Sequence, residues 1–370
     1  MSASTPDFSE NEQRPLTPFE TAQMRPVLAT TEWPSELVEF ANHRRINVPA
    51  EGAAPKPEVR RTSEGGSDFW SIRVPVGPQG DVPLPGKTAI RSNPEELLSE
   101  IDPEATVGPY RPEWLDLLYV PRLLPDRIGK KIPRLRGGLA EPQFVFDPDN
   151  RSELAETGWP WGCVGKIVNN EGQNGSAALV GDRLVVTAGH AVPWDSEQWW
   201  MRFVPAYYNG TSLYGAGVES YVSDVRGWNP VATGGTVGYD WAICRLYEPL
   251  GVPLGYFGAK TYNPAWNHQA VWANMGYPIN MWFVGASLQG GIPIENTYDD
   301  SNGGLECEHY GDITKGNSGG PMFAYFGDQD PRIISVQSSQ VVNDDGSRVN
   351  IAAGGSGLPQ LINWGRTNWP

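Results

Sequence analysis

Three short segments contain residues that could together activate a hydroxyl group. Thr187-Ala-Gly-His190 ends a strand-like run with a histidine, one of four in the chain. Gly316-Asn-Ser318-Gly-Gly-Pro321 places a serine among glycines, and Asp240 opens the apolar run from Trp241 to Leu246. Each segment alone also has an ordinary structural explanation: an exposed histidine, a glycine turn or an acid at a strand end. Their combination is more specific than any one of them.

These residue types suit the attack of a serine on a carbonyl group. A serine hydroxyl is a poor nucleophile near neutral pH and needs a neutral imidazole to take its proton. The imidazole needs a carboxylate that fixes its tautomer and stabilises its charged form. We therefore predict Ser318 as the nucleophile, His190 as the base and Asp240 as the orienting acid. The N–H groups of Gly316 and Ser318 are predicted to form the oxyanion hole.

The order of these segments resembles that of a known family. His190, Asp240 and Ser318 follow one another at gaps of 50 and 78 residues. Thr-Ala-Gly-His and Gly-x-Ser-Gly-Gly-Pro are the most diagnostic strings of the trypsin/chymotrypsin-like serine endopeptidases, which the chain resembles over about residues 144–365. A narrower resemblance, to the glutamyl endopeptidase branch, rests on residues 144–151, 157–160 and 164–167 and on Asn317.

The resemblance implies an all-β, chymotrypsin-like fold of two antiparallel six-stranded β-barrels. The first is expected at about 145–249 and the second at about 255–351, followed by a C-terminal helix at about 358–364. The histidine and the aspartate then come from the first barrel and the serine from the second, with the site in the cleft between them. The implied function is that of a serine endopeptidase that hydrolyses peptide bonds through an acyl-enzyme intermediate and needs no cofactor.

The pattern of turns and apolar runs agrees with such a fold. Apolar runs at 164–168, 176–180 and 184–187 are separated by Gly- and Asn-containing turns and predict a meander. At the other end of the chain, Leu358 to Trp364 is predicted as a helix that Gly365 stops.

The first 143 residues have a different composition, with 20 of the 34 prolines. Prolines exclude long helices and central strands, so only short helices are predicted, at 34–40, 93–101 and 112–120. Two alternatives remain for this leader. It is either a pro-segment removed by cleavage between Lys130 and Phe144, where a basic, glycine-containing connector is open to nicking, or a permanent N-terminal domain.

Two residues are candidates for the substrate pocket. By analogy with the family, Asp312 falls at the floor of the primary specificity pocket, and Gln337 replaces the histidine with which glutamyl endopeptidases meet the substrate carboxylate. A neutral amide supplies no positive charge and Asp312 repels a carboxylate, so we expect no strict preference for glutamate. If its carboxylate points inward, Asp312 favours a basic residue; the alternative is a turn residue that faces solvent.

The chain also departs from its relatives. Many of them bridge the histidine loop with a disulfide, but here Gly175 and Ala191 fill the two places, so this loop is expected to rely on packing alone. Asn317 replaces an aspartate that in digestive relatives receives the new N-terminal amine. Activation through that ion pair is therefore not expected here.

Charge and cysteine content limit the remaining classes. A net charge of −15 disfavours nucleic acid and anionic membranes as partners. The family resemblance implies protein or peptide substrates. No transmembrane run and no signal peptide are visible, although the family resemblance suggests an extracellular protein. Cys307 and His309 lack a second ligand pair at zinc spacing, so no metal is expected. The rival to an enzyme is a catalytically silent binding protein on a protease fold.

Overall fold

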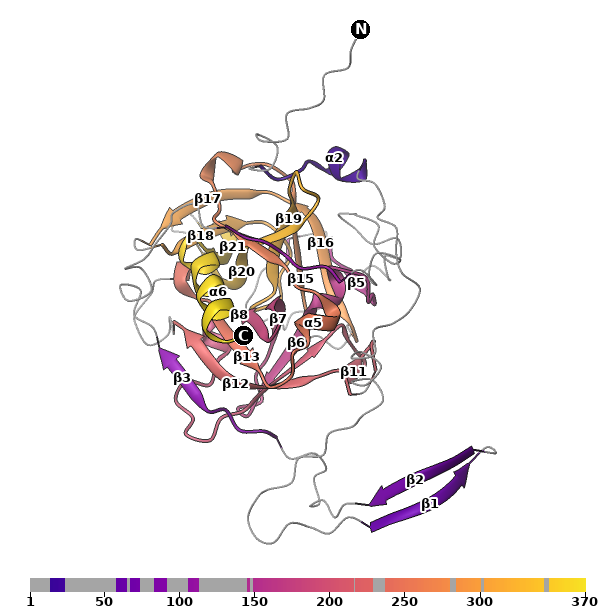
Figure 1. Ribbon diagram of the computed structural model, residues 1–370. Helices are drawn as coiled ribbons and strands as arrows, with labels where there is room; N and C mark the ends of the chain where they lie inside the picture. The colour runs from indigo at the N-terminus through magenta and orange to yellow at the C-terminus, as the bar shows by residue number, and fades with distance from the viewer. Residues whose placement is uncertain are drawn as a thin grey trace.

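Figure 1 shows the computed structural model. It describes residues 14–23, 58–64, 67–73, 83–91, 106–112, 145–146, 149–215, 217–228, 237–279, 284–300, 303–342 and 346–370. The helices predicted at 34–40, 93–101 and, beyond Pro112, 112–120 lie outside these residues, as does the segment between Lys130 and Phe144.

The first barrel is a closed ring of six antiparallel strands. The predicted meander is confirmed, because β6, β7 and β8 pair in sequence order. Strand β12 pairs with β13 and thereby closes the ring. Around the ring the strands are β13 (Ala242–Leu246), β8 (Leu184–Thr187), β7 (Asn174–Gly181), β6 (Val164–Asn169), β9 (Met201–Pro205) and β12 (Ser220–Gly227). Inward-facing apolar side chains fill it, as in other small barrels.

The second barrel also closes, but through one bent strand. Pro293 cannot donate to the ladder and separates β16 from β17, so the same stretch of chain pairs with β15 on one side and β18 on the other. Around the ring the strands are β15 (Trp272–Gly276), β16 (Ala286–Ile292) with β17 (Ile294–Asp299), β18 (Leu305–His309), β21 (Arg348–Gly354), β20 (Pro331–Val342) and β19 (Pro321–Tyr325). The all-β fold of two six-stranded barrels is therefore confirmed.

Smaller elements surround the barrels. Strand β5 (Ser152–Leu154) pairs with β16, and β14 (Gly258–Lys260) pairs with β20. Two hairpins stand apart from these sheets, β1 (Glu58–Glu64) with β2 (Ser67–Arg73) and β10 (Tyr207–Tyr208) with β11 (Thr211–Ser212). The short helices are α2 (Pro18–Ala22), α5 (Gly251–Leu254) and the 3₁₀ turns η2 (Trp161–Cys163), η3 (Gly189–Ala191), η5 (Val237–Tyr239) and η6 (Pro264–Trp266). No helix among the described residues is long and apolar enough to span a membrane.

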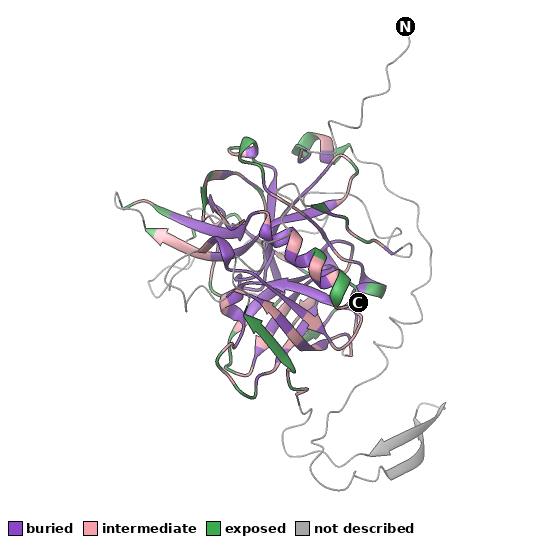
Figure 2. Ribbon diagram, turned by 60° about the vertical axis from the view of Figure 1, so that its left-hand side comes forward, coloured by how far each residue is buried: buried purple, intermediate pink, exposed green. Residues whose placement is uncertain are grey.

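The C-terminal helix α6 (Gly357–Asn368) is longer than predicted and contacts strands of both barrels (Figures 1 and 2). Leu358, Leu361 and Ile362 form its buried face at helical spacing. Gly365 does not end the helix. A Cβ there would lie 2.6 Å from Ile243 Cδ1, so this glycine lets the helix approach the first barrel closely.

Parts of the leader are built into the barrels. Strand β3 (Thr88–Arg91) is exposed along its whole length and pairs in parallel with β12, and β4 (Thr106–Val107) pairs with β14 (Figure 2). Leu16 is buried, and its N–H donates to Tyr325 O at 2.7 Å. Arg366 of α6 donates to Gly108 O at 2.7 Å and to Phe257 O at 2.9 Å. It therefore joins the leader to the part of the chain that contains the barrels.

These contacts predict the behaviour of a nicked chain. If a protease cleavage site is introduced at 131–143 and cut, the N-terminal fragment should stay bound, because its strands remain hydrogen-bonded to β12 and β14. Size-exclusion chromatography under native conditions, with mass spectrometry of the peak, tests this. Separate elution of the two fragments would contradict it.

Candidate active site

His190 lies on a tight turn at the end of β8. The strand stops at Thr187, and the 3₁₀ turn η3 carries the histidine at its centre. Gly189 allows this turn, because a Cβ there would collide with Trp228 O and lie 3.2 Å from Asp240 Oδ1. The indole of Trp194 donates to Gly189 O at 2.8 Å. The side chain of His190 remains 31% exposed, so its ring is open to a bound molecule.

Asp240 is buried, and both of its oxygens face His190. Its Oδ1 accepts from His190 N at 2.8 Å, and its Oδ2 lies 2.6 Å from His190 Nδ1. A carboxylate can only accept, so Nδ1 carries the proton and Nε2 is left as the basic nitrogen. The hydroxyl of Ser338, from the second barrel, also donates to Oδ2. Asp240 thus fixes the tautomer and orientation of the histidine.

The charges of this pair support each other. Burial alone would raise the pKa of Asp240, but the charge and hydrogen bonds of His190 and the hydrogen bond of Ser338 outweigh it and lower that pKa. Burial likewise acts to lower the pKa of His190, and the Asp240 carboxylate overrides it and raises that pKa above its ordinary value. An imidazolium formed at His190 is therefore stabilised where it forms.

The loop that carries Ser318 approaches the histidine turn closely. Gly319, at a φ of 82°, has no room for a Cβ, which would collide with Ser176 O and lie 2.7 Å from Ala188 N. Ser318 O accepts from Ser176 N at 2.7 Å. The structure therefore brings the serine segment of the second barrel against the start of the His190 turn.

Gly316 has a backbone conformation that favours glycine. Its φ is 100°, and a Cβ would lie 2.5 Å from Tyr277 O, so other residues are excluded. The Ser176 hydroxyl donates to Gly316 O at 2.7 Å and accepts from Tyr277 N at 2.8 Å. Within the described part of the chain, Gly316 N–H has no hydrogen-bond acceptor. That N–H remains the donor predicted for the oxyanion hole.

The side chain of Asn317 anchors the same loop. It is fully buried, donates to Ser287 Oγ at 3.0 Å and accepts from Thr314 N at 3.3 Å. Its partners are a hydroxyl and a backbone amide. Sequence reasoning did not identify Ser176, Ser287 or Ser338, because single serines in strands carry no distinguishing pattern.

Asp312 is buried, so the alternative that it is a turn residue facing solvent is wrong. It is 1% exposed, and its two carboxylate oxygens accept from Phe146 N and Asn150 N, both at 2.7 Å. Burial raises its pKa. The carboxylate thus holds the segment that leads into the first barrel.

Gln337 is also fully engaged inside the protein. Its Oε1 lies 3.0 Å from His309 Nε2, and its Nε2 donates to Ile351 O at 3.1 Å. His309 Nδ1 accepts from Gly311 N, so the ring is neutral and donates through Nε2. Burial lowers the pKa of His309 to about 4. No group of three or more potential metal ligands occurs among the described residues.

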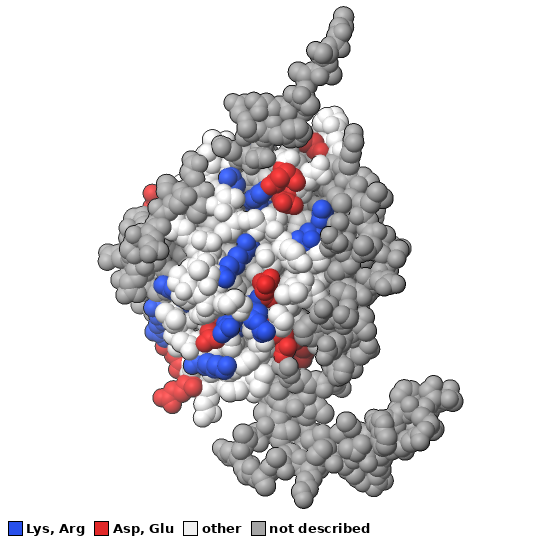
Figure 3. Space-filling view, viewed as in Figure 1, with Lys and Arg blue, Asp and Glu red and all other residues white. Residues whose placement is uncertain are grey.

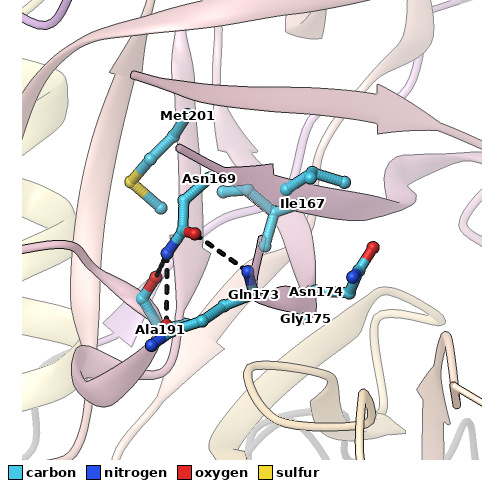
Figure 4. Close-up of a pocket in the computed structure, with 8 residues that line it drawn as sticks. Ile167, Asn169, Gln173, Asn174, Gly175, Ala191 and Met201 are labelled. Carbon is cyan, nitrogen blue, oxygen red and sulfur yellow. Dashed lines mark hydrogen bonds between the residues drawn. The ribbon is translucent and has the colours of Figure 1, made fainter. Parts of the chain in front are cut away.

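The histidine loop is held by more than packing, contrary to expectation. The buried Asn169 side chain donates to Ala191 O and to Gln173 Oε1, both at 3.1 Å, and accepts from Gln173 N (Figure 4). This single amide connects β6 to the loop after His190. The three cysteines, Cys163, Cys244 and Cys307, are buried and free.

Sequence comparison gives one curated relative. Over 186 residues the chain is 27% identical to a glutamyl endopeptidase of Bacillus licheniformis. The match covers 48% of this chain and 54% of the relative, so the chain spans about half the length of the curated relative it matches. This similarity confirms the predicted resemblance to the glutamyl endopeptidases. No protein-family model matches the chain.

Three solved structures show a partial likeness. They are a Glu endopeptidase in complex with MPD (18% identity, TM-score 0.49, 61% of this chain and 100% of the other), a thermostable serine protease AL20 from an extremophilic microorganism (22%, 0.44, 56% and 98%) and the protease Anisep from Arthrobacter nicotinovorans (22%, 0.43, 58% and 99%). Likenesses at this level say nothing about the reaction.

The histidine loop yields a testable prediction. A Cβ at Gly175 would lie 3.7 Å from Ala191 Cβ, within the range of about 3.5–4.5 Å seen in disulfides. The double variant Gly175→Cys/Ala191→Cys should form a disulfide and raise the free energy of unfolding by about 2–4 kcal/mol. Denaturant unfolding with and without reductant measures this, with the two single variants as controls.

Two outcomes would contradict it: thiols that stay reactive under oxidising conditions, or an oxidised protein no more stable than the reduced one. The Cβ added at position 175 would also lie 3.1 Å from Ser318 O. The serine loop must therefore shift slightly in the variant.

Proposed function

We propose that this chain is a serine endopeptidase. The observation that carries the proposal is the buried Asp240 carboxylate, whose two oxygens hold His190 with its Nε2 free, beside the loop of Ser318. The curated relative is named a glutamyl endopeptidase, which supports a peptidase activity. The likeness covers about half of each chain, so activity and substrate remain our proposal.

The reaction follows from these positions. His190 Nε2 takes the proton of Ser318, whose oxygen attacks the scissile carbonyl carbon. The N–H groups of Gly316 and Ser318 stabilise the oxyanion, and the loop that carries them is already fixed by Ser176 and Asn317. His190 then gives its proton to the leaving amine, which releases the first product and leaves an acyl group on Ser318. Water, activated by the same histidine, hydrolyses the ester.

Removing the nucleophile tests this mechanism. Ser318→Ala should lower kcat/KM on a peptide substrate by at least about three orders of magnitude, while the thermal unfolding temperature stays near that of the parent protein. Ser196→Ala, which removes a half-buried hydroxyl that accepts from Asn170 Nδ2 beside the histidine loop, is the matched control and should keep its activity. Unchanged turnover in purified Ser318→Ala protein would refute the assignment.

A catalytically silent binding protein is the rival function. The two differ in reactivity toward a fluorophosphonate, which phosphonylates a serine only where a base and an oxyanion hole activate it. Labelling confined to Ser318 supports the enzyme, and an unlabelled, folded protein supports the silent scaffold.

We further propose that the enzyme has no strict preference for glutamate. Gln337 is fully buried, and its amide is hydrogen-bonded to His309 and Ile351, so it offers a substrate carboxylate neither a charge nor a free donor. The Asp312 carboxylate is held by the amides of Phe146 and Asn150. This arrangement also weakens the case for Asp312 as a receptor of basic side chains.

A positional-scanning peptide library measures this preference. We expect cleavage after several residue types, with glutamate not dominant, because neither Gln337 nor Asp312 supplies a positive charge. Exclusive cleavage after glutamate would show that another group recognises the carboxylate.

Residues 1 to about 143 are proposed to be a pro-segment cut between Lys130 and Phe144. The basic connector before Phe144 supports this. The strands that the leader adds to both barrels favour the alternative of a permanent domain. N-terminal sequencing of active protein from its native source separates the two.

A further inference from the structure

The turn before Asp240 donates two hydrogen bonds to carboxylates of the opposite barrel. Asp240 follows directly on η5, and its own N–H donates to Val237 O at 3.0 Å within that turn. The N–H groups at the start of a 3₁₀ turn have no partner inside it. Here Gly238 N donates to Asp300 Oδ2 at 2.6 Å and Val237 N to Glu306 Oε1 at 3.3 Å.

Both carboxylates come from one hairpin of the second barrel. Strands β17 and β18 pair from Ile294 to His309, and Asp300 N donates to Gly304 O at 3.1 Å where the chain reverses. The hairpin thus reaches across to the first barrel and ends beside the turn that carries the catalytic acid.

The contact is too close to be incidental. A Cβ at Gly238 would lie 2.7 Å from both Asp300 Oδ2 and Leu305 N, so only glycine fits. A Cβ at Gly304 would lie 2.7 Å from the ring of Tyr239, so the hairpin also closes around this side chain. Trp241 Nε1 fixes the other side of the turn, since it donates to Gly238 O at 3.0 Å.

We propose that Asp300 and Glu306 are positioning residues for the catalytic acid: the β17–β18 hairpin of the second barrel sets the place of Asp240 in the first. The inference rests on the proposed function. It extends that function, because the hydrogen bonds of His190 and Ser338 to the Asp240 carboxylate do not involve this hairpin. The two barrels are therefore joined at the catalytic acid twice, by Ser338 at its carboxylate and by the hairpin at its backbone.

The negative charges of Asp300 and Glu306 make the contact between the hairpin and the turn dependent on pH. Burial and the neighbouring Asp300 carboxylate raise the pKa of Glu306 to about 7. Glu308 adds a further negative charge, whereas the strand neighbours Tyr298 and Ala353 are uncharged. Below pH 7 a proton on Glu306 relieves the repulsion, and above it two negative charges face each other in a half-buried place.

The sign of the effect on stability follows. The pKa of Glu306 is higher in the folded protein than its ordinary value of 4.5. The folded state then binds a proton that the unfolded state has released, so the free energy of unfolding falls as pH rises from about 4.5 to about 7.

Glu306→Gln should remove this part of the pH dependence of the free energy of unfolding, and Glu295→Gln, on the same hairpin, should leave it in place.

The decisive variant is Asp300→Ala, with the neighbouring exposed Asp299→Ala as its control. Asp300→Ala should lower kcat about tenfold or more while KM stays within about twofold, because substrate contacts are untouched. Amide hydrogen exchange at Val237 and Gly238 should quicken in this variant alone. Asp300→Asn keeps an acceptor for Gly238 N–H and should restore most of the rate.

Two results overturn the proposal: an Asp300→Ala protein with the kcat of Asp299→Ala, or unchanged exchange at Gly238. Failure of the proposed function is a separate outcome, recognised when the parent protein shows no turnover that depends on Ser318. The exchange measurement needs no activity and still decides whether the hairpin holds the turn. If Asp300→Ala does not fold, Asp300→Ser, whose side chain is too short to replace the acceptor for Gly238 N–H, is compared with Asp299→Ser in the same two measurements.

Discussion

The structure depends on one buried charge, the carboxylate of Asp240. Burying a carboxylate is costly unless hydrogen bonds surround it, and here its partners come from both barrels. His190 supplies its backbone N–H and its ring, and Ser338 supplies a hydroxyl. Neither barrel alone meets this requirement. The hydrogen bonds to this one anion therefore join the two barrels, and the segments of His190 and Ser318 meet at that junction.

Small residues make that junction possible. Gly189, Gly316 and Gly319 each stand where a side chain would overlap backbone atoms, of Trp228, Tyr277 and Ser176 respectively. At Gly319 this lets the serine loop approach the start of the histidine turn. Figure 3 shows basic and acidic side chains interspersed on the face in view, even though the chain is acidic overall.

What the sequence predicted, and what it did not, follows from the range of the interactions. The strings around His190 and Ser318 and the meander of β6 to β8 are local, and they identified the candidate triad and the fold class. Phe146, a partner of Asp312, lies 166 residues away in sequence, and His309, a partner of Gln337, lies 28 residues away. No local sequence pattern indicates such distant hydrogen-bond partners. Likewise, a glycine is typical of a helix end, but Gly365 lies inside α6, where it allows close contact with Ile243.

We propose that His190 and Asp240, where the two barrels meet, activate Ser318 for covalent catalysis. Rapid mixing with a nitrophenyl ester, followed by acid quenching and peptide mass spectrometry, tests it most directly. We expect a burst of nitrophenol equal to one equivalent of protein and an acyl group on Ser318. Turnover without a burst, or acylation at another residue with Ser318 unmodified, would contradict it.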